Sequence, residues 1–224
     1  MYNNFTKSKA LMISVLVTGT LMLATNAVAG KGKGKPGKNV IAPGGTIAEI
    51  AATVNDGGNG EFNNLLGVVG CFGDVTLIPG DNPIIDLLNG SDKYTLFAPT
   101  DVAFVNLLGR LEPLFPGVTA NPCILDNNDD LAENTLFTVL AYHVTDGRRF
   151  SNSVFNVNSA KMIDTLAGAD ITTYVEMDGT PILHDVDGQE VNVVPDMINI
   201  NAVNGVIHVI DTVLLPIELP VTDD

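Results

Sequence analysis

The sequence predicts an α+β fold, with helices in its N-terminal half and most of its strands in its C-terminal half. Apolar residues recur at helical spacing between Thr46 and Leu140, and strand-like patterns dominate after His143. The dipeptides Asp178-Gly179 and Asp187-Gly188 are signals for tight hairpin turns between those strands. Helices that precede a run of hairpin strands are typical of this fold class.

Three helices are predicted before the first strand. Thr46 and Glu49 have the spacing of a capping box, and the apolar residues that follow predict a helix over 46–54. A second helix is predicted over 61–69. A third is expected to begin at Pro83, with Asn82 or Asp81 as its N-cap.

The first strand is predicted over 94–99, and Thr100 or Asp101 is expected to cap the helix that follows it. A loop rich in Pro, Asn and Asp covers 111–130, and helical spacing returns over 131–140. The strands expected in the C-terminal half are 171–176, 181–184, 190–194, 198–201 and 206–210.

The charge is divided between a basic N-terminal segment and an acidic body. The chain has 224 residues, with 11 basic and 26 acidic side chains and a net charge of −15. Residues 1–38 hold six lysines and no acid, so the rest carries five basic residues against 26 acidic ones, 5 − 26 = −21. Nucleic acids are bound through clustered Lys and Arg, so this body argues against a nucleic-acid partner. Trp is absent and aromatics are 6%, which disfavours a platform of stacked aromatic rings.

Residues 1–29 have the pattern of a secretory signal peptide. Lys7 and Lys9 precede an apolar stretch, and residues 27–29 provide a small-x-small cleavage pattern before Gly30. A retained membrane anchor is the alternative, but the uninterrupted apolar run is shorter than the roughly 20 residues that span a bilayer. We therefore expect a secreted protein, extracellular or periplasmic, with no transmembrane segment after cleavage.

Residues 30–43 are expected to form a basic linker rich in Gly and Lys. They contain matches to G-x-G-x-x-G and G-x-x-x-x-G-K, but the predicted signal peptide precedes these matches, and the segment 40–45, which ends in Pro-Gly-Gly, follows them. Both phosphate-binding motifs require a strand before them and a helix after them, so a linker is the better interpretation.

Cys71 and Cys123 are the only cysteines of the chain. An even pair in an exported protein indicates a disulfide. Closing so long a loop would stabilise the fold by roughly 3–4 kcal/mol on the chain-entropy model.

Three ordered motifs resemble the signature of fasciclin-type adhesion domains. The segment 95–104 resembles the first box of that signature, the segment 204–216 resembles the second, and Tyr142-His143 matches the tyrosine–histidine pair between them. The residues that carry the two boxes are Thr95, Phe97, Pro99, Thr100, Phe104, Asn204, Gly205 and His208.

The resemblance covers about residues 44–217, followed by an acidic C-terminal tail over 218–224. It implies a single domain in which N-terminal helices pack on a wedge of mostly antiparallel strands. Residues 67–92 and 109–130 look longer than in the family, and each brings one cysteine, so a Cys71–Cys123 bridge would tie the two insertions together.

The resemblance also implies a function: a secreted cell-adhesion or extracellular-matrix module that binds a surface or matrix protein or a polysaccharide. It leaves room for weak self-association, and it implies no catalysis and no cofactor. The alternative is a periplasmic small-molecule-binding or enzymatic protein that uses a pocket near Tyr142 and His143. These two residues are the candidates for partner contact, and a buried, hydrogen-bonded pair is the competing interpretation.

Motifs for catalysis and metal binding are missing from the sequence. It contains neither G-x-S-x-G nor H-E-x-x-H, and its three histidines lack metal-ligand spacing. The acidic run 126–130 lacks the Gly and Glu that an EF-hand requires, so no metal site is expected. His208 lies in an apolar strand and is expected to be a hydrogen-bonded core histidine.

Overall fold

The computed structural model describes residues 44–54, 61–72, 82–125 and 135–219. All of them belong to one compact unit, Lys38–Asp224. The predicted signal peptide, linker and acidic run 126–130, the Asp81 cap and the end of the acidic tail lie outside the described residues. None of the described helices is long and apolar enough to cross a membrane.

Three short α-helices precede the first strand, as the sequence predicts. The capping box is confirmed: the Thr46 N–H donates to Glu49 Oε2 (2.8 Å), and the Glu49 N–H donates to Thr46 Oγ1 (3.2 Å). The Asn82 side chain caps the third helix by accepting the backbone N–H groups of Ile84 and Ile85. These elements are α1 (Ile47–Val54), α2 (Asn63–Val69), the 3₁₀ turn η2 (Gly70–Phe72) and α3 (Pro83–Asn89).

Thr100 is the cap of the helix after the first strand, since its hydroxyl accepts the Ala103 N–H (3.2 Å). Asp101 instead caps α2: its carboxylate accepts the Asn64 N–H (2.7 Å), and its own N–H donates to Glu61 O (2.9 Å). The remaining helices are α4 (Asp101–Leu111), η3 (Pro122–Leu125), α5 (Thr135–Tyr142), α6 (Ser151–Val154) and η4 (Pro195–Met197). The turns η2, η3 and η4 and the helix α6 were not expected from the sequence.

The described strands form two four-stranded sheets. Sheet A has the order β2-β1-β8-β7 and sheet B the order β3-β4-β5-β6. The pair β1–β8 is parallel, and every other strand pair in these sheets is antiparallel. The strands are β1 (Tyr94–Pro99), β2 (Val144–Asp146), β3 (Lys161–Asp164), β4 (Asp170–Val175), β5 (Pro181–His184), β6 (Glu190–Asn192), β7 (Ile200–Ala202) and β8 (Gly205–Ile210). The predicted α+β class is confirmed, and β2 and β3 are strands for which the sequence analysis gave no range.

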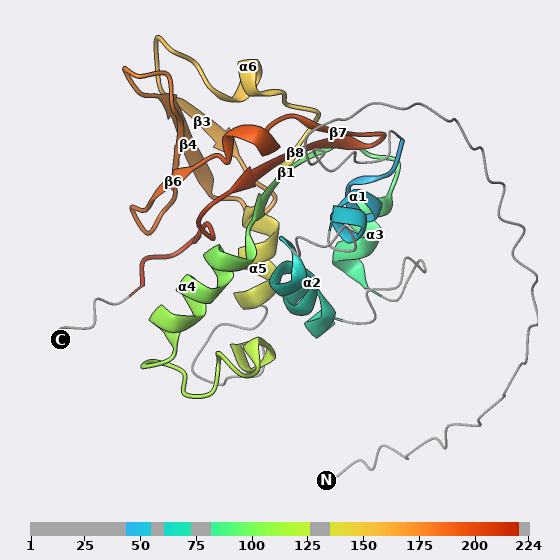
Figure 1. Cartoon of the computed structure of the whole chain (residues 1–224), viewed down its shortest axis with the longest axis vertical. Helices are drawn as coiled ribbons and strands as arrows, with labels where there is room; N and C mark the ends of the chain where they lie inside the picture. Colours follow the sequence, from blue (N-terminus) through green and yellow to red (C-terminus); the bar gives the residue numbers. More distant parts are fainter. Residues whose placement is uncertain (1–43, 55–60, 73–81, 126–134, 220–224) are drawn as a thin grey trace, which may run out of the picture. The chain divides into compact units, whose positions relative to one another are not determined.

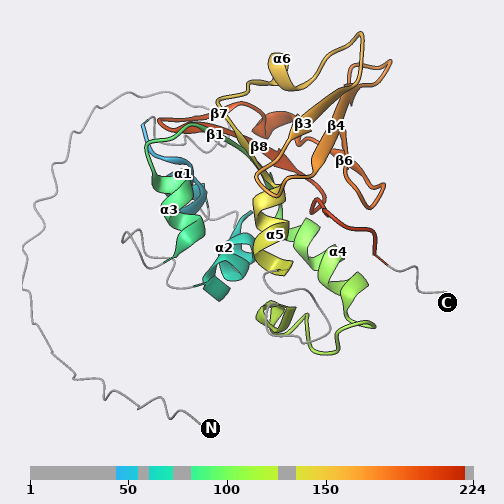
Figure 2. The same cartoon turned by 180° about the vertical axis from the view of Figure 1, so that it is seen from behind.

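Sheet A lies between helices α1–α5 and sheet B, whereas α6 lies on the side of sheet B (Figures 1 and 2). Along β1, Leu96 and Ala98 pack in the core shared with the helices, whereas Phe97 packs in the core shared with sheet B. All six residues of β8 are buried, so the central parallel pair is covered on both faces, as is usual for parallel strands. The two sheets are joined near their ends by a bridge between Val193 and Ile210.

The turn before β8 is fixed by Asn204. Its side-chain oxygen accepts the Ile47 N–H (2.8 Å), and its amide nitrogen donates to Leu88 O (2.8 Å) and Gly90 O (3.0 Å). This buried side chain therefore joins α1 and α3 to the start of the central strand. Gly205 is required next to it, because a Cβ there would lie 2.1 Å from Tyr94 O.

The predicted Cys71–Cys123 disulfide is confirmed. It joins η2 to η3, with the two Cα atoms 5.3 Å apart. The bridge therefore connects the two segments that look longer than in the family.

We predict that replacing both cysteines, Cys71→Ser with Cys123→Ser, lowers Tm by roughly 5–15 °C, because the unfolded chain regains loop entropy. Calorimetry with and without reductant measures this. Wild-type protein should lose stability on reduction and the double variant should not. An unchanged wild-type Tm would show that the bridge contributes nothing.

We predict that Gly205→Ala destabilises the fold by about 3 kcal/mol or more, since the methyl group would collide with backbone rather than a movable side chain. Gly67→Ala is the matched control: it lies inside α2, and a methyl group there would have nothing within 4 Å. Urea unfolding should show the control at or above wild-type stability. Equal behaviour of the two variants would contradict the close approach at Gly205.

Candidate functional site

His143 connects the end of α5 to the C-terminal segment through the protein interior. Its ring Nδ1 donates to Val139 O (2.7 Å), and its Nε2 accepts the Leu214 N–H (2.9 Å). These two bonds require the neutral ring with its proton on Nδ1. The side chain is 2% exposed, and burial lowers the pKa of His143 to about 4.

Tyr142 lies on the opposite side of the chain, in the core between the two sheets. Its hydroxyl donates to Asp170 O (2.8 Å), and burial raises its pKa to about 12. Tyr142 and His143 thus bond to different backbone groups in different cores. The structure places neither side chain where a partner could touch it, and their contacts favour the buried, hydrogen-bonded interpretation.

His208 is a core histidine, as predicted. It is fully buried and stacks on Phe97, with ring centroids 5.7 Å apart. Its Nε2 donates to Arg149 O (2.9 Å), and its Nδ1 accepts the Asn199 N–H (3.3 Å). Burial lowers the pKa of His208, so this ring also stays neutral at pH 7.

The other signature residues also support the fold. The Thr95 hydroxyl donates to Gly147 O (2.7 Å) and accepts the Arg149 N–H (2.8 Å). Phe97 and Phe104 are buried, one on each side of sheet A, and Pro99 pairs with Ile210 at the end of the parallel ladder. Together with Thr100, Asn204 and Gly205, these residues form caps, turns and core rather than a polar cluster.

Thr95 and His208 meet the same surface loop, and this convergence was not foreseen from the sequence. Both bond to the backbone of Gly147–Arg149, the segment that leaves β2. In and directly after this segment, Arg148 and Phe150 are exposed and Arg149 is partly exposed. A signal was available: Arg148 and Arg149 are adjacent in a body that has only five basic residues.

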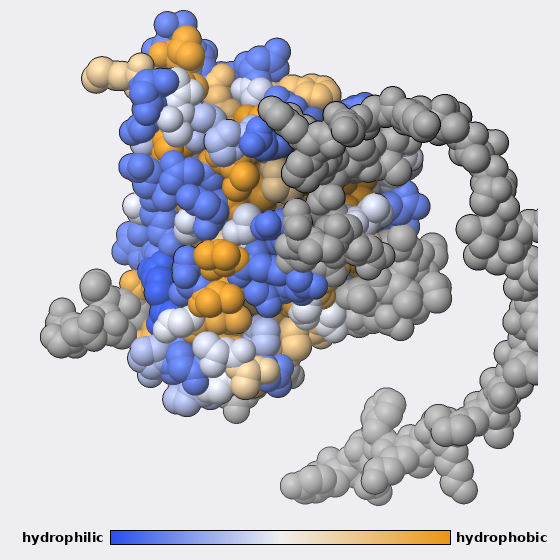
Figure 3. Space-filling view, viewed as in Figure 1, coloured by the Kyte–Doolittle hydropathy of each residue, from blue (hydrophilic) through white to orange (hydrophobic). Residues whose placement is uncertain are grey.

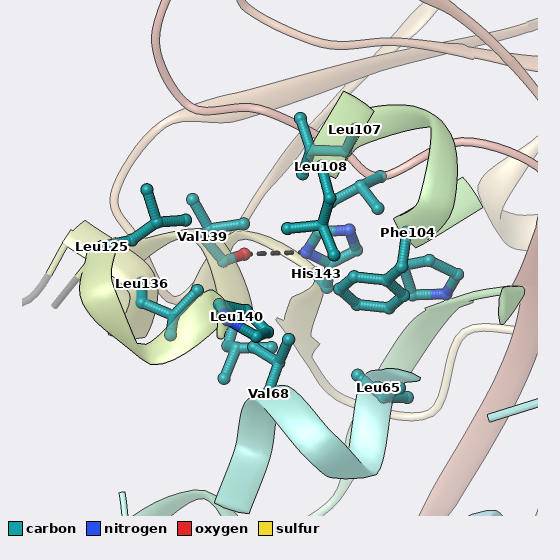
Figure 4. A pocket seen from close by; sticks show the side chains of 13 residues that line it. Leu65, Val68, Phe104, Leu107, Leu108, Leu125, Leu136, Val139, Leu140 and His143 are labelled. Carbon is teal, nitrogen blue, oxygen red and sulfur yellow. Dashed lines mark hydrogen bonds between the residues drawn. The ribbon is translucent and has the colours of Figure 1, made fainter. Parts of the chain in front are cut away.

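Two small cavities flank His143, of about 20 and 30 Å³. The side chains around the first, including Leu136, Leu140 and Phe104, are apolar apart from the His143 ring (Figure 4). Each cavity has room for about one water molecule. Both ring nitrogens of His143 are already hydrogen-bonded, so neither cavity gathers free polar groups from the described residues. Nor do those residues bring together three or more His, Cys, Asp or Glu side chains that could hold a metal ion.

Most of the signature residues are buried inside a two-sheet domain, whose α+β class is the one that the resemblance to fasciclin-type domains implies. Comparison with known families agrees with this class of protein. The model of the Fasciclin domain family matches residues 81–216, more than half of the chain. The chain therefore belongs to the fasciclin domain family.

Two relatives come from the cyanobacterium Synechocystis sp. "Protein sll1483" is 31% identical over 178 residues, covering 76% of this chain and 73% of the relative. "Uncharacterized protein sll1735" is 31% identical over 146 residues, covering 63% of this chain and 86% of the relative. Among solved structures, a FAS1 domain pair from the insect cell adhesion molecule fasciclin I is similar, with 18% identity and a TM-score of 0.48. The match covers 70% of this chain and 45% of that pair.

We predict that the free energy of unfolding falls as the pH is lowered from 6.5 to about 4. In this range an unfolded chain binds a proton on His143 that the folded protein excludes, so acid favours unfolding by up to about 3 kcal/mol. His143→Gln keeps a hydrogen-bonding side chain but cannot titrate. Urea unfolding at pH 7 and pH 4.5 should show a smaller loss in this variant, and an equal loss would contradict the assignment.

Proposed function

We propose that the protein is a secreted module for cell adhesion or extracellular-matrix contact, which binds a protein or a polysaccharide through its exposed surface. One observation carries this proposal: the signature residues serve the fold and not a reaction. Their polar atoms bond to backbone groups of the domain itself, so they hold a surface in shape instead of forming a reaction site.

Family membership and chemistry support the proposal. Fasciclin domains are commonly found in adhesion proteins and are typically extracellular, and the family is generally non-enzymatic. The Cys71–Cys123 disulfide is suited to an oxidising compartment outside the cytoplasm. The strongly acidic body would also help to keep an exported domain soluble.

Most of the protein surface on the side drawn in Figure 3 is polar. Figure 3 shows a predominantly hydrophilic face with a small hydrophobic area over α4. The exposed valines of that helix are Val102 (64%) and Val105 (60%). Two side chains are a small apolar area compared with the roughly 800 Å² per partner of a stable protein interface. On this face, recognition would therefore depend on polar and charged groups.

The alternative, a periplasmic small-molecule-binding or enzymatic protein, would have to use the cavities at His143. Those cavities are small and apolar, and the imidazole that borders both is already hydrogen-bonded on each nitrogen. A reactive site needs convergent polar groups with free bonding capacity. The described residues give this alternative no such group at His143, so we favour the adhesion module.

The proposal predicts saturable attachment of the purified protein to extracellular polymer or to cell surfaces. Fluorescently labelled protein is added to immobilised extracellular material from a secreting cell culture, and the retained fraction is measured against concentration. An unrelated monomeric protein of similar acidity controls for non-specific charge effects. Retention no greater than that of the control would contradict the proposed function.

A further inference from the structure

Three of the five basic residues of the acidic body meet at one end of sheet A. They are Lys93, Arg148 and Arg149, and we call them the basic corner. Lys93 directly precedes β1, and the two arginines follow β2, beside the turn between β7 and β8. These chain segments lie side by side in both views (Figures 1 and 2). The body therefore concentrates its scarce positive charge in one place.

The backbone under the basic corner is held from inside the domain. Gly147 N–H donates to Lys93 O (2.6 Å), which joins the two cationic segments. Thr95 and His208 bond to the backbone of Gly147 and Arg149 from below. A surface fixed by buried side chains loses little conformational entropy when it binds, which favours affinity.

The charged groups themselves are oriented by backbone carbonyls. Lys93 Nζ donates to Val203 O (3.1 Å), and Arg148 Nη2 donates to the neighbouring Ala202 O (3.1 Å) and to the Asn201 side chain. Arg149 Nε donates to Asp146 O (2.9 Å). Each of these cations keeps further N–H donors beyond these bonds.

No carboxylate of the described residues forms an ion pair with the basic corner. The one ion pair found among those residues joins Arg110 to Asp187, elsewhere in the domain. Asp146 is directly opposite Tyr94 in the ladder and shares its side of sheet A, where Tyr94 packs toward the helices. Lys93 and Thr95 alternate with Tyr94, so they lie on the other side. Asp146 thus faces away from the corner. Burial raises the pKa of Tyr94, and the nearby charge of Asp92, which precedes Lys93, raises it further, but Asp92 forms no ion pair with the described cations.

Partly exposed apolar groups border the corner. Phe150 is 39% exposed with the Arg148 guanidinium 5.8 Å from its ring centre, and Val203 is 49% exposed. Two such side chains are too few for the buried aromatic core of a stable protein–protein interface. Arginine is well suited to carboxylate and sulfate groups, because its planar N–H pairs can bind two oxygens at once.

We propose that the basic corner is the binding site for an anionic polysaccharide that carries carboxylate or sulfate groups. This inference rests on the proposed function and names its surface and partner class. Acidic groups of the body that lie more than about 8 Å from the corner do not prevent such binding, since charges at that distance are largely screened at physiological ionic strength. Binding should weaken as salt is raised.

The test measures binding of the purified protein to four immobilised polymers: polygalacturonate, dextran sulfate, neutral dextran and polyglutamate. The test variant carries Arg148→Gln and Arg149→Gln. The matched control carries Arg110→Gln and Lys161→Gln, which removes the same charge elsewhere in the domain. Circular dichroism checks that both variants fold, and binding is repeated at low and high salt.

We expect binding to polygalacturonate or dextran sulfate but not to neutral dextran, and about tenfold or greater weakening in the test variant alone. Preference for one of the two anionic polysaccharides identifies carboxylate or sulfate as the recognised group. Equal weakening in both variants, or binding to neutral dextran, would overturn the proposal. So would tighter binding to polyglutamate, which would indicate an acidic protein partner.

The failure of this inference can be separated from failure of the proposed function. If the protein attaches to extracellular material but binds neither anionic polysaccharide, the proposed function stands and the basic corner is not its binding site. If the protein attaches neither to extracellular material nor to these polysaccharides, the proposed function and the proposed site are both wrong. If the test variant does not fold, the single variant Lys93→Gln provides the same comparison, with Lys161→Gln as its control.

Discussion

The parallel pairing of β1 with β8 is the interaction on which the rest of the domain depends. Six consecutive residue pairs join these strands, from Tyr94 with Gly205 to Pro99 with Ile210. Alternate side chains of these two strands pack into two cores, one between sheet A and the helices and the other between sheet A and sheet B. Because both faces are covered, a defect in this ladder would disturb both cores at once, and both signature boxes lie along it.

The histidines of the signature act as structural connectors. Each neutral ring donates to one backbone carbonyl and accepts one backbone N–H, and these two groups belong to segments that are far from each other in sequence. An apolar residue of similar size could not form these bonds. His143 connects α5 to the chain after β8, and His208 connects β8 to the loop that carries the arginines. These polar signature residues thus hold segments near the surface in fixed positions relative to the core.

Local signals in the sequence predicted the fold well, whereas long-range contacts could not be predicted. The Thr46 capping box and the Asn82 cap were predictable, because the groups involved lie within a few residues of each other. Asp101 caps a helix through Asn64, 37 residues earlier in the chain, and no local pattern announces that. Strand β3 was missed because its apolar residues Met162 and Ile163 are adjacent, with one exposed and one buried, so the expected alternation is weak. The candidate site was harder to predict than the fold. Tyr142 and His143 are adjacent in sequence but face different cores, and the loop at Arg148 is held by contacts with β1 and β8 that no local pattern indicates.

The side chain of Asn204 has a consequence for how the protein folds. It bonds to Ile47 N–H, 157 residues earlier, and the β1–β8 ladder likewise joins distant parts of the chain. Contacts with such large sequence separation form slowly, because the entropy of closing the intervening loop is lost before the contacts stabilise the structure. The contacts of α1 and α3 with the start of β8 therefore form only after almost the whole chain has been synthesised. The central parallel ladder and the core on each side of it can be completed only once β8 has been made.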